Sequence, residues 1–363
     1  MRDKSIDVVG GIMVLYMVFR HCVLLSHLTE TWWGGVLTYY PLLFLMAWFF
    51  FKGGMFFQTE PLQHTIRKSV DRLLIPYIVF SLLAIIIGVI LYGSVLGKEG
   101  IHRFVADLPI HLKREGAVEF NAPLWFLPSL FFVRVFFSFS QALHLPAWIV
   151  TVSALVSAWG IQIAGLPIGL YFGNIALGLF FFCAGYLLKE CQFKKMSLVL
   201  SSFYYVFFLV YCFITQAVAG DFITNRHIPF LPTIVFFISG CVLINNLFKR
   251  AHASQFEFLA RAGEQSMAVY ITHFIVLSTI TLLNDNTLKL SPYPLFLLLV
   301  LSQLIVLPCL TRLLSRPGLL WMTGGKSTSK LCLDRRLAMV GTTLTAFVMS
   351  TYVIYHLVLS FIR

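Results

Sequence analysis

Two ionisable side chains in the first apolar segment have the clearest capacity for chemistry, namely Asp7 and His21. They are 14 residues apart, which at 100° per residue is about 40° short of four full turns. Both therefore lie on one face of a helix, about 21 Å apart along its axis. An imidazole that titrates near neutral pH can act as a general base, and a structural hydrogen bond is the equally weighted alternative for His21.

A second histidine, His273, lies in another apolar segment that begins at Ser266. A charged side chain at membrane depth costs at least about 2.5–3.5 kcal/mol, so ionisable residues there usually face the interior of a helical bundle. Taken alone, His273 fits a structural role better than a catalytic one.

Arg67, Lys68 and Arg72 form a basic cluster where a third apolar segment begins, with Asp71 among them. Arg and Lys donors combined with free N–H groups at a helix start can bind phosphates. The alternative is an orientation signal for membrane insertion, and spacing alone favours that alternative by about two to one.

Asn121, Pro123 and Trp125 open a further apolar segment. Asn121 suits a helix cap, Pro123 suits a first helical turn, and Trp125 fits an aromatic belt at a membrane interface. A structural interpretation is therefore sufficient for all three residues.

The composition identifies the setting of these residues. Of 363 residues, 59% are hydrophobic and 12% are charged, whereas soluble domains carry roughly 25% charged residues. The chain is therefore predicted to be a single membrane domain over 1–363. The net charge of +12 reflects basic residues between apolar segments rather than a nucleic-acid site. The seven Cys are scattered without metal-ligand spacing, so we expect no metal.

Spans of about 20 mostly apolar residues predict an all-α polytopic bundle of 10 to 11 helices. The fifth candidate is the weakest, because prolines lie at both of its ends. The candidates are 6–27, 36–57, 72–93, 122–141, 146–164, 170–189, 196–218, 229–248, 266–284, 292–314 and 337–360.

The distribution of positive charge predicts the orientation. With the N-terminus in the cytoplasm, about two thirds of the 27 Lys and Arg fall on the cytoplasmic side, Lys52 among them. The C-terminus is then expected outside, and the segment 93–121 is expected to be a solvated external loop that can include a short interfacial helix. The first apolar run is too long for a cleavable signal peptide and lacks a small-residue cleavage site.

In order along the chain, six segments resemble motifs of the acyltransferase-3 family of integral membrane acyltransferases. Each motif is weak, but their order across roughly 270 residues is specific. They are the Asp7-to-His21 span, the Phe-rich run 44–54 ending in small residues, the Arg-to-Pro entry 72–77, Leu-Trp-Phe-Leu at 124–127, the Phe-rich run 180–188, and Tyr-Ile-Thr-His at 270–273.

The resemblance implies transfer of an acyl group, commonly acetyl, from cytoplasmic acyl-coenzyme A to a hydroxyl of a glycan or similar acceptor, in the inner (cytoplasmic) membrane and without a fused esterase-like domain. It implies that His21 is the catalytic base or transient acyl carrier, with Asp7 in the catalytic set. Its further implications are that Arg67, Lys68 and Arg72 hold the donor phosphates and that Asn121, Trp125 and His273 support the substrates. The expected partners are acyl-CoA, a glycan or lipid-linked glycan and the bilayer, with no nucleic acid; homo-oligomer formation stays open.

The chain departs from the family pattern at two basic positions. Where the family's first span usually has an Arg, this chain has Gly10, and where the third-span entry often has a second Arg, it has Ser69. Arg67 or Lys68 can compensate for Ser69. The Gly10 departure bears on donor binding and on activity.

Two other functions are compatible with the sequence. A transporter or flippase for a glycan-lipid or small solute would also use many spans with few buried charges, although no inverted repeat or pair of broken helices is evident. A non-catalytic member of the same fold is the third alternative, because of Gly10.

Overall fold

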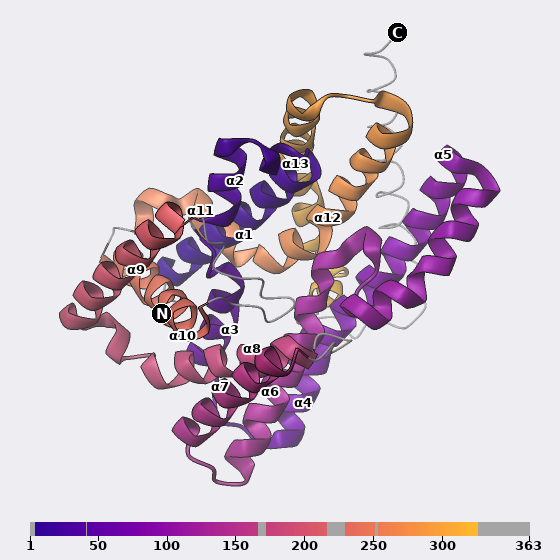
Figure 1. The fold of residues 1–363 in the computed structure, drawn as a ribbon. Helices are drawn as coiled ribbons and strands as arrows, with labels where there is room; N and C mark the ends of the chain where they lie inside the picture. Colours follow the sequence, from indigo (N-terminus) through magenta and orange to yellow (C-terminus); the bar gives the residue numbers. More distant parts are fainter. Residues whose placement is uncertain (1–3, 41, 166–171, 216–228, 251–252, 326–363) are drawn as a thin grey trace. The chain divides into compact units, whose positions relative to one another are not determined.

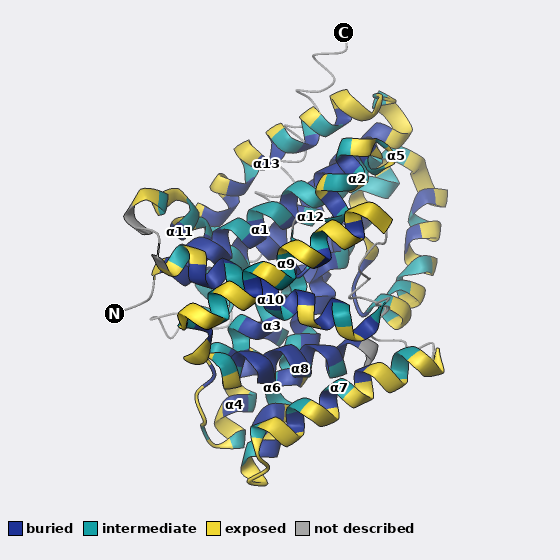
Figure 2. Cartoon of the chain, turned by 60° about the vertical axis from the view of Figure 1, so that its left-hand side comes forward, coloured by how far each residue is buried: buried dark blue, intermediate teal, exposed yellow. Residues whose placement is uncertain are grey.

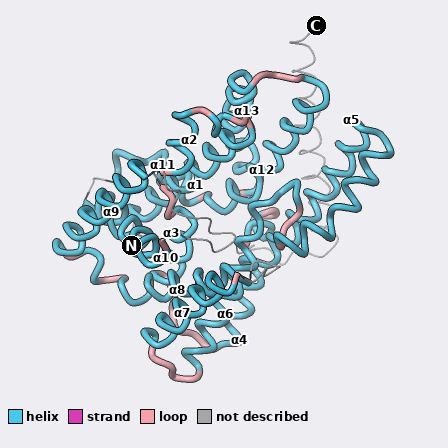
Figure 3. The backbone as a smooth tube through the Cα atoms, viewed as in Figure 1, coloured by secondary structure: helices cyan, strands magenta, loops and turns pink. Residues whose placement is uncertain are grey.

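The computed structural model describes residues 4–40, 42–165, 172–215, 229–250 and 253–325. Within these ranges the chain forms helices and loops without a strand (Figure 3). The helices, labelled in Figure 1, are α1 (Lys4–Leu25), α2 (Trp32–Tyr39), α3 (Leu45–Met55), α4 (Leu62–Ser69), α5 (Ile75–Glu115), α6 (Phe126–Ala142), α7 (Ala147–Ala164), α8 (Phe172–Leu188), α9 (Lys195–Thr215), α10 (Phe230–Arg250), α11 (Glu257–Glu264), α12 (Ser266–Leu283) and α13 (Pro292–Leu314).

Seven helical stretches of the described chain are long and apolar enough to cross a membrane, and Asn174–Leu188 is a shorter apolar helix. This confirms the predicted all-α polytopic class. The large side chains that α7 and α9 expose are mostly apolar, as expected of helices that face lipid, whereas α12 is largely buried (Figure 2). The predicted span 337–360 lies outside the described residues.

Two predicted segments differ from the structure. The span 36–57 is divided between α2 and α3, and Pro41 follows the end of α2, where it disfavours a continuing helix. The segment 93–121 is helical over most of its length, more than the short interfacial helix that the sequence suggests, because α5 continues to Glu115. Within α5 the backbone breaks at Gly97, whose φ of +69° is accessible to glycine at little cost.

The described chain divides into two compact units, each interrupted in sequence. The first unit comprises Met1–Met17, Thr31–Val70 and Phe126–Ser266. The second comprises Val18–Glu30, Asp71–Trp125 and Met267–Arg363. The unit boundary falls inside α1, so this one helix contributes its first part to the first unit and its last part to the second.

Glycines allow α3 and α8 of the first unit to pack backbone against backbone. A Cβ atom added at Gly54 would lie 1.8 Å from the carbonyl oxygen of Phe182, and one added at Gly185 would lie 2.0 Å from that of Phe51. Only glycine therefore permits this approach at either position. Phe51 and Phe182 are fully buried beside it.

This packing predicts that Gly54→Val destabilises the protein. The added side chain must displace the α8 backbone, and overpacking of this kind costs about 1–3 kcal/mol or more. The measurement is thermal unfolding of the detergent-purified protein. Gly160→Ala in α7 is the control, because a Cβ there meets no atom within 4 Å. Equal unfolding temperatures for the two variants would contradict the observed helix packing.

Candidate active site

The second unit brings together the two histidines of the apolar segments, His21 on α1 and His273 on α12. Nδ1 of His21 lies 3.0 Å from Nε2 of His273. The two rings are stacked, with centroids 5.2 Å apart and planes 16° from parallel, and Phe274 meets the His21 ring edge-on. His273 is fully buried, whereas His21 is partly exposed. Packing of apolar helices alone does not account for a direct contact between two imidazole rings, so this pair is the candidate active site.

The hydrogen bonds of this pair determine its tautomers. Nδ1 of His273 lies 2.8 Å from the carbonyl oxygen of Tyr270, one turn earlier in α12. Since a carbonyl can only accept, this Nδ1 carries a hydrogen, and in a neutral ring Nε2 of His273 is then an acceptor. The donor to that acceptor is Nδ1–H of His21. Nε2 of His21 therefore presents its lone pair, as a general base requires.

Three further side chains of the second unit hold the α12 backbone around His273. Asn121, fully buried, donates through Nδ2 to the carbonyl oxygen of Ile271 at 3.0 Å. The Tyr270 hydroxyl donates to the carbonyl oxygen of Pro123. Gln303 of α13 approaches the His273 carbonyl oxygen through Nε2, at 3.4 Å. These contacts fix the turn from which the His273 ring projects.

Two expectations for the segment before α6 were wrong. Asn121 does not cap α6, because it lies within a 3₁₀ segment, Glu119–Trp125, with φ −146° and ψ 56°, and its amide is committed to α12. Trp125 is buried rather than part of an exposed interfacial belt, with 5% of its surface exposed. Both residues therefore belong to the interior of the second unit, and Asn121 holds the α12 backbone next to His273.

The basic cluster is divided between elements. Arg67 and Lys68 lie in the last turn of α4, in the first unit, and Arg67 is exposed. Arg72 is exposed in the π-helix Val70–Leu74 that follows α4, and it belongs to the second unit. Within the second unit the Arg72 backbone packs on Gly324, where a Cβ would lie 2.7 Å from the Arg72 Cα atom.

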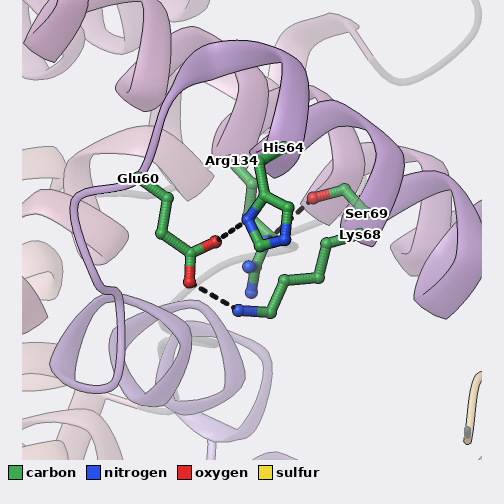
Figure 4. Close-up of polar contacts among 5 residues, drawn as sticks. All are labelled: Glu60, His64, Lys68, Ser69 and Arg134. Carbon is green, nitrogen blue, oxygen red and sulfur yellow. Dashed lines mark hydrogen bonds and ion pairs between the residues drawn. The ribbon is translucent and has the colours of Figure 1, made fainter.

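Polar side chains meet around α4, on what we call the α4 surface, and Figure 4 draws their contacts. Glu60 accepts hydrogen bonds from Lys68 at 2.8 Å and from His64 at 2.7 Å, and these bonds, that of Lys68 first, lower the pKa of the Glu60 carboxyl. Arg134 of α6 donates through Nε to the Ser69 hydroxyl at 3.2 Å. An arginine side chain therefore contacts position 69, but from a neighbouring helix. The sequence alone gave no sign of this contact, because residues 69 and 134 are far apart in the chain.

Asp7 lies in the first turn of α1 and is buried, with 5% of its surface exposed. It belongs to the first unit, so the structure does not describe it together with the histidine pair. Its place in the catalytic set stays a prediction from the family resemblance. Among the described residues, no group of three or more His, Cys, Asp or Glu could hold a metal ion.

Residues 3–312 match a family model described as an acyltransferase domain. The match covers most of the chain, including every candidate site residue named above. No curated protein and no solved structure matches the sequence.

Proposed function

Since the chain belongs to the acyltransferase-3 family and is a membrane acyltransferase, we propose that it transfers an acetyl group from acetyl-coenzyme A to a hydroxyl of a glycan or similar acceptor. The observation that carries this proposal is the contact between His21 and His273 at 3.0 Å. It supplies a base of defined tautomer at the position expected for the reaction. Asp7 remains a proposed member of the catalytic set.

In the proposed reaction, Nε2 of His21 takes the proton from the acceptor hydroxyl as the oxygen attacks the thioester carbonyl. The C–O bond forms, and the C–S bond then breaks to release the thiolate of coenzyme A. The thiolate recovers the proton from the His21 imidazolium, so acid and base are the same ring. His273 stabilises the imidazolium by accepting its Nδ1–H, as an orienting group does in other acyl-transfer sites. An acetyl-His21 relay is the variant in which Nε2 attacks first.

The cations near α4 are the proposed donor-binding surface. Arg67, Lys68 and Arg72 carry positive charge on exposed or partly exposed side chains, and a coenzyme A molecule carries several phosphate charges. With the N-terminus in the cytoplasm, this surface faces the compartment that supplies acyl-coenzyme A. The acceptor hydroxyl then approaches His21 from the outer side of an inner-membrane protein.

The first test is a thermal-unfolding titration of the detergent-purified protein with acetyl-coenzyme A. A ligand that binds the folded state at 100 times its Kd stabilises it by about 2.7 kcal/mol. We expect the wild type to shift and Arg72→Ala to shift less at the same concentration. A transporter of glycan-lipid would not be stabilised by this ligand, so an unchanged wild type would favour the transporter and overturn the proposal.

A second prediction concerns Glu60, whose carboxylate engages Lys68. Glu60→Gln is expected to tighten acetyl-coenzyme A binding by about twofold to fivefold. The substitution removes a partly exposed negative charge that repels the negative phosphates of the donor at the proposed site. The pKa of Glu60 is lowered in the folded protein, so the Glu60 carboxylate stabilises the fold above its unfolded pKa. This stabilisation is lost as the pH falls through the folded pKa and the carboxylate becomes protonated. The same tightening is therefore expected at acidic pH in the wild type only.

The control is Glu257→Gln, which removes a carboxylate that pairs with Arg261 on exposed α11. Its pKa is also lowered, first by the Arg261 hydrogen bond, but it lies outside the α4 surface. Equal changes in Kd for the two variants would show that α4 is not the donor-binding surface.

A further inference from the structure

Lys52 lies near the end of an apolar helix, and its ammonium is directed toward a neighbouring helix. It belongs to α3, three residues before the last residue Met55, and it is partly buried. A lysine near the end of a membrane helix ordinarily extends its ammonium to the interface. Here Nζ lies 3.1 Å from the position that a Cβ atom of Gly10 would occupy. The ammonium therefore turns toward α1 of the same unit.

Three helices of the first unit meet at this ammonium. The same point beside Gly10 lies 3.6 Å from the Cα atom of Gly263 in α11 and 3.6 Å from the ring of Trp48 in α3. The ammonium lies 5.1 Å from the Trp48 ring centroid, as in a cation–π contact. The indole is fixed in turn, because Nε1 of Trp48 donates to Oδ1 of Asn245 at 2.9 Å. The ammonium is thus positioned against the fixed Trp48 ring, in space that Gly10 and Gly263 leave open because they have no side chains.

The residue that faces Lys52 shares a face of α1 with His21. Gly10 and His21 are 11 residues apart, which is three turns plus about 20°, so they lie on one stripe about 16 Å apart along the helix. Asp7, one turn before Gly10, places a buried carboxylate on the same part of α1. A partly buried charge in an otherwise apolar helix is costly and is a candidate functional residue. A lysine ammonium is also a compact phosphate-binding charge.

We propose that Lys52 binds a phosphate group of the coenzyme A donor, at the position where Gly10 leaves α1 without a cation. In this chain the basic side chain beside Gly10 comes from α3, and its charge lies next to the stripe of α1 that leads to His21. This inference rests on the proposed function and adds to it a residue that the α4 surface does not include.

The test compares two probes, acetyl-coenzyme A and acetyl-pantetheine, which keeps the thioester but lacks the diphosphate and the nucleotide. Lys52→Ala is expected to weaken acetyl-coenzyme A binding by about tenfold to hundredfold, the loss typical of a hydrogen bond to a charged group. Acetyl-pantetheine binding is expected to stay unchanged. Lys52→Arg is expected to retain most of the affinity, since it keeps the positive charge.

The matched control replaces the positive charge of Lys52 on α3 by one at position 10 of α1. Gly10→Arg alone is expected to weaken binding, because its Cβ would lie 3.1 Å from the ammonium. In the double variant Gly10→Arg/Lys52→Ala that space is vacant, and affinity is expected to recover to within about threefold of the wild type, a coupling that a double-mutant cycle measures. Circular dichroism and unfolding temperature verify that each variant is folded.

The outcomes separate this inference from the proposed function. A wild type that binds neither probe contradicts the proposed function itself. A wild type that binds acetyl-coenzyme A while folded Lys52→Ala binds it equally well contradicts the role of Lys52 alone. Equal losses for both probes would show that Lys52 supports the helix packing and does not contact phosphate.

Discussion

His21→Ala is expected to lower the rate of acetyl transfer by about 10²–10⁴-fold, the contribution typical of a general base. Its binding of acetyl-coenzyme A is expected to be unchanged, because the donor phosphates are held elsewhere. The measurement is transfer of isotope-labelled acetyl from acetyl-coenzyme A to the glycan and lipid fractions of membranes that contain the protein. His102→Ala, an exposed position in α5, is the control and should transfer at the wild-type rate.

A His21→Ala protein that transfers acetyl as fast as the wild type would contradict the assignment of the base. The thermal shift with acetyl-coenzyme A is measured on the same variant, because a variant whose unfolding temperature still rises is folded and binds the donor. Loss of both transfer and binding would instead place His21 in the donor site.

His273→Phe is expected to lower kcat by about 10²-fold with the KM for acetyl-coenzyme A unchanged. An aromatic ring is kept, but the acceptor for Nδ1–H of His21 is lost, so the base is neither oriented nor stabilised as an imidazolium. A small misplacement of a reacting group can cost that much. Steady-state kinetics of labelled acetyl transfer measures both constants.

His273→Gln distinguishes a positioning role from a packing role. Its amide oxygen can accept the hydrogen bond of His21, so part of the lost kcat is expected to return. Rates that are equal for His273→Gln and His273→Phe would show that the hydrogen bond has no catalytic effect. An unchanged kcat in both variants would remove His273 from the site.

Much of the fold could be predicted because a membrane imposes a simple rule on sequence. A helix that crosses lipid needs a long apolar run, and predicted spans such as 292–314 and 266–284 agree closely with α13 and α12. The predicted span 36–57 and the segment 93–121 differed for local reasons. Pro41 follows α2, and α5 continues beyond Gly97 as a helix of mixed charge, a composition that equally suits a solvated loop. One membrane domain over 1–363 stays a prediction.

The candidate site was predictable only where a single helix defines it. Helical spacing places Asp7, Gly10 and His21 on one stripe of α1, but it contains no information about what faces that stripe. His273 lies 252 residues from His21 in the chain, and its value as a partner appears only when α1 and α12 meet. Asn121 and Lys52 illustrate the same limit. The sequence suggests a helix cap for Asn121 and an orientation signal for Lys52, but in the structure Asn121 contacts α12 and Lys52 approaches α1.

Photoaffinity labelling tests most directly whether the donor thioester reaches the histidine pair. An acyl-coenzyme A analogue with a diazirine in a short acyl chain is bound to the purified protein, irradiated, and the labelled peptides are identified by mass spectrometry. The account predicts labels in the last part of α1 around His21 and in α12 around His273, suppressed by excess acetyl-coenzyme A. Labels confined to the lipid-facing helices α7 and α9, or labels that acetyl-coenzyme A does not suppress, would contradict it.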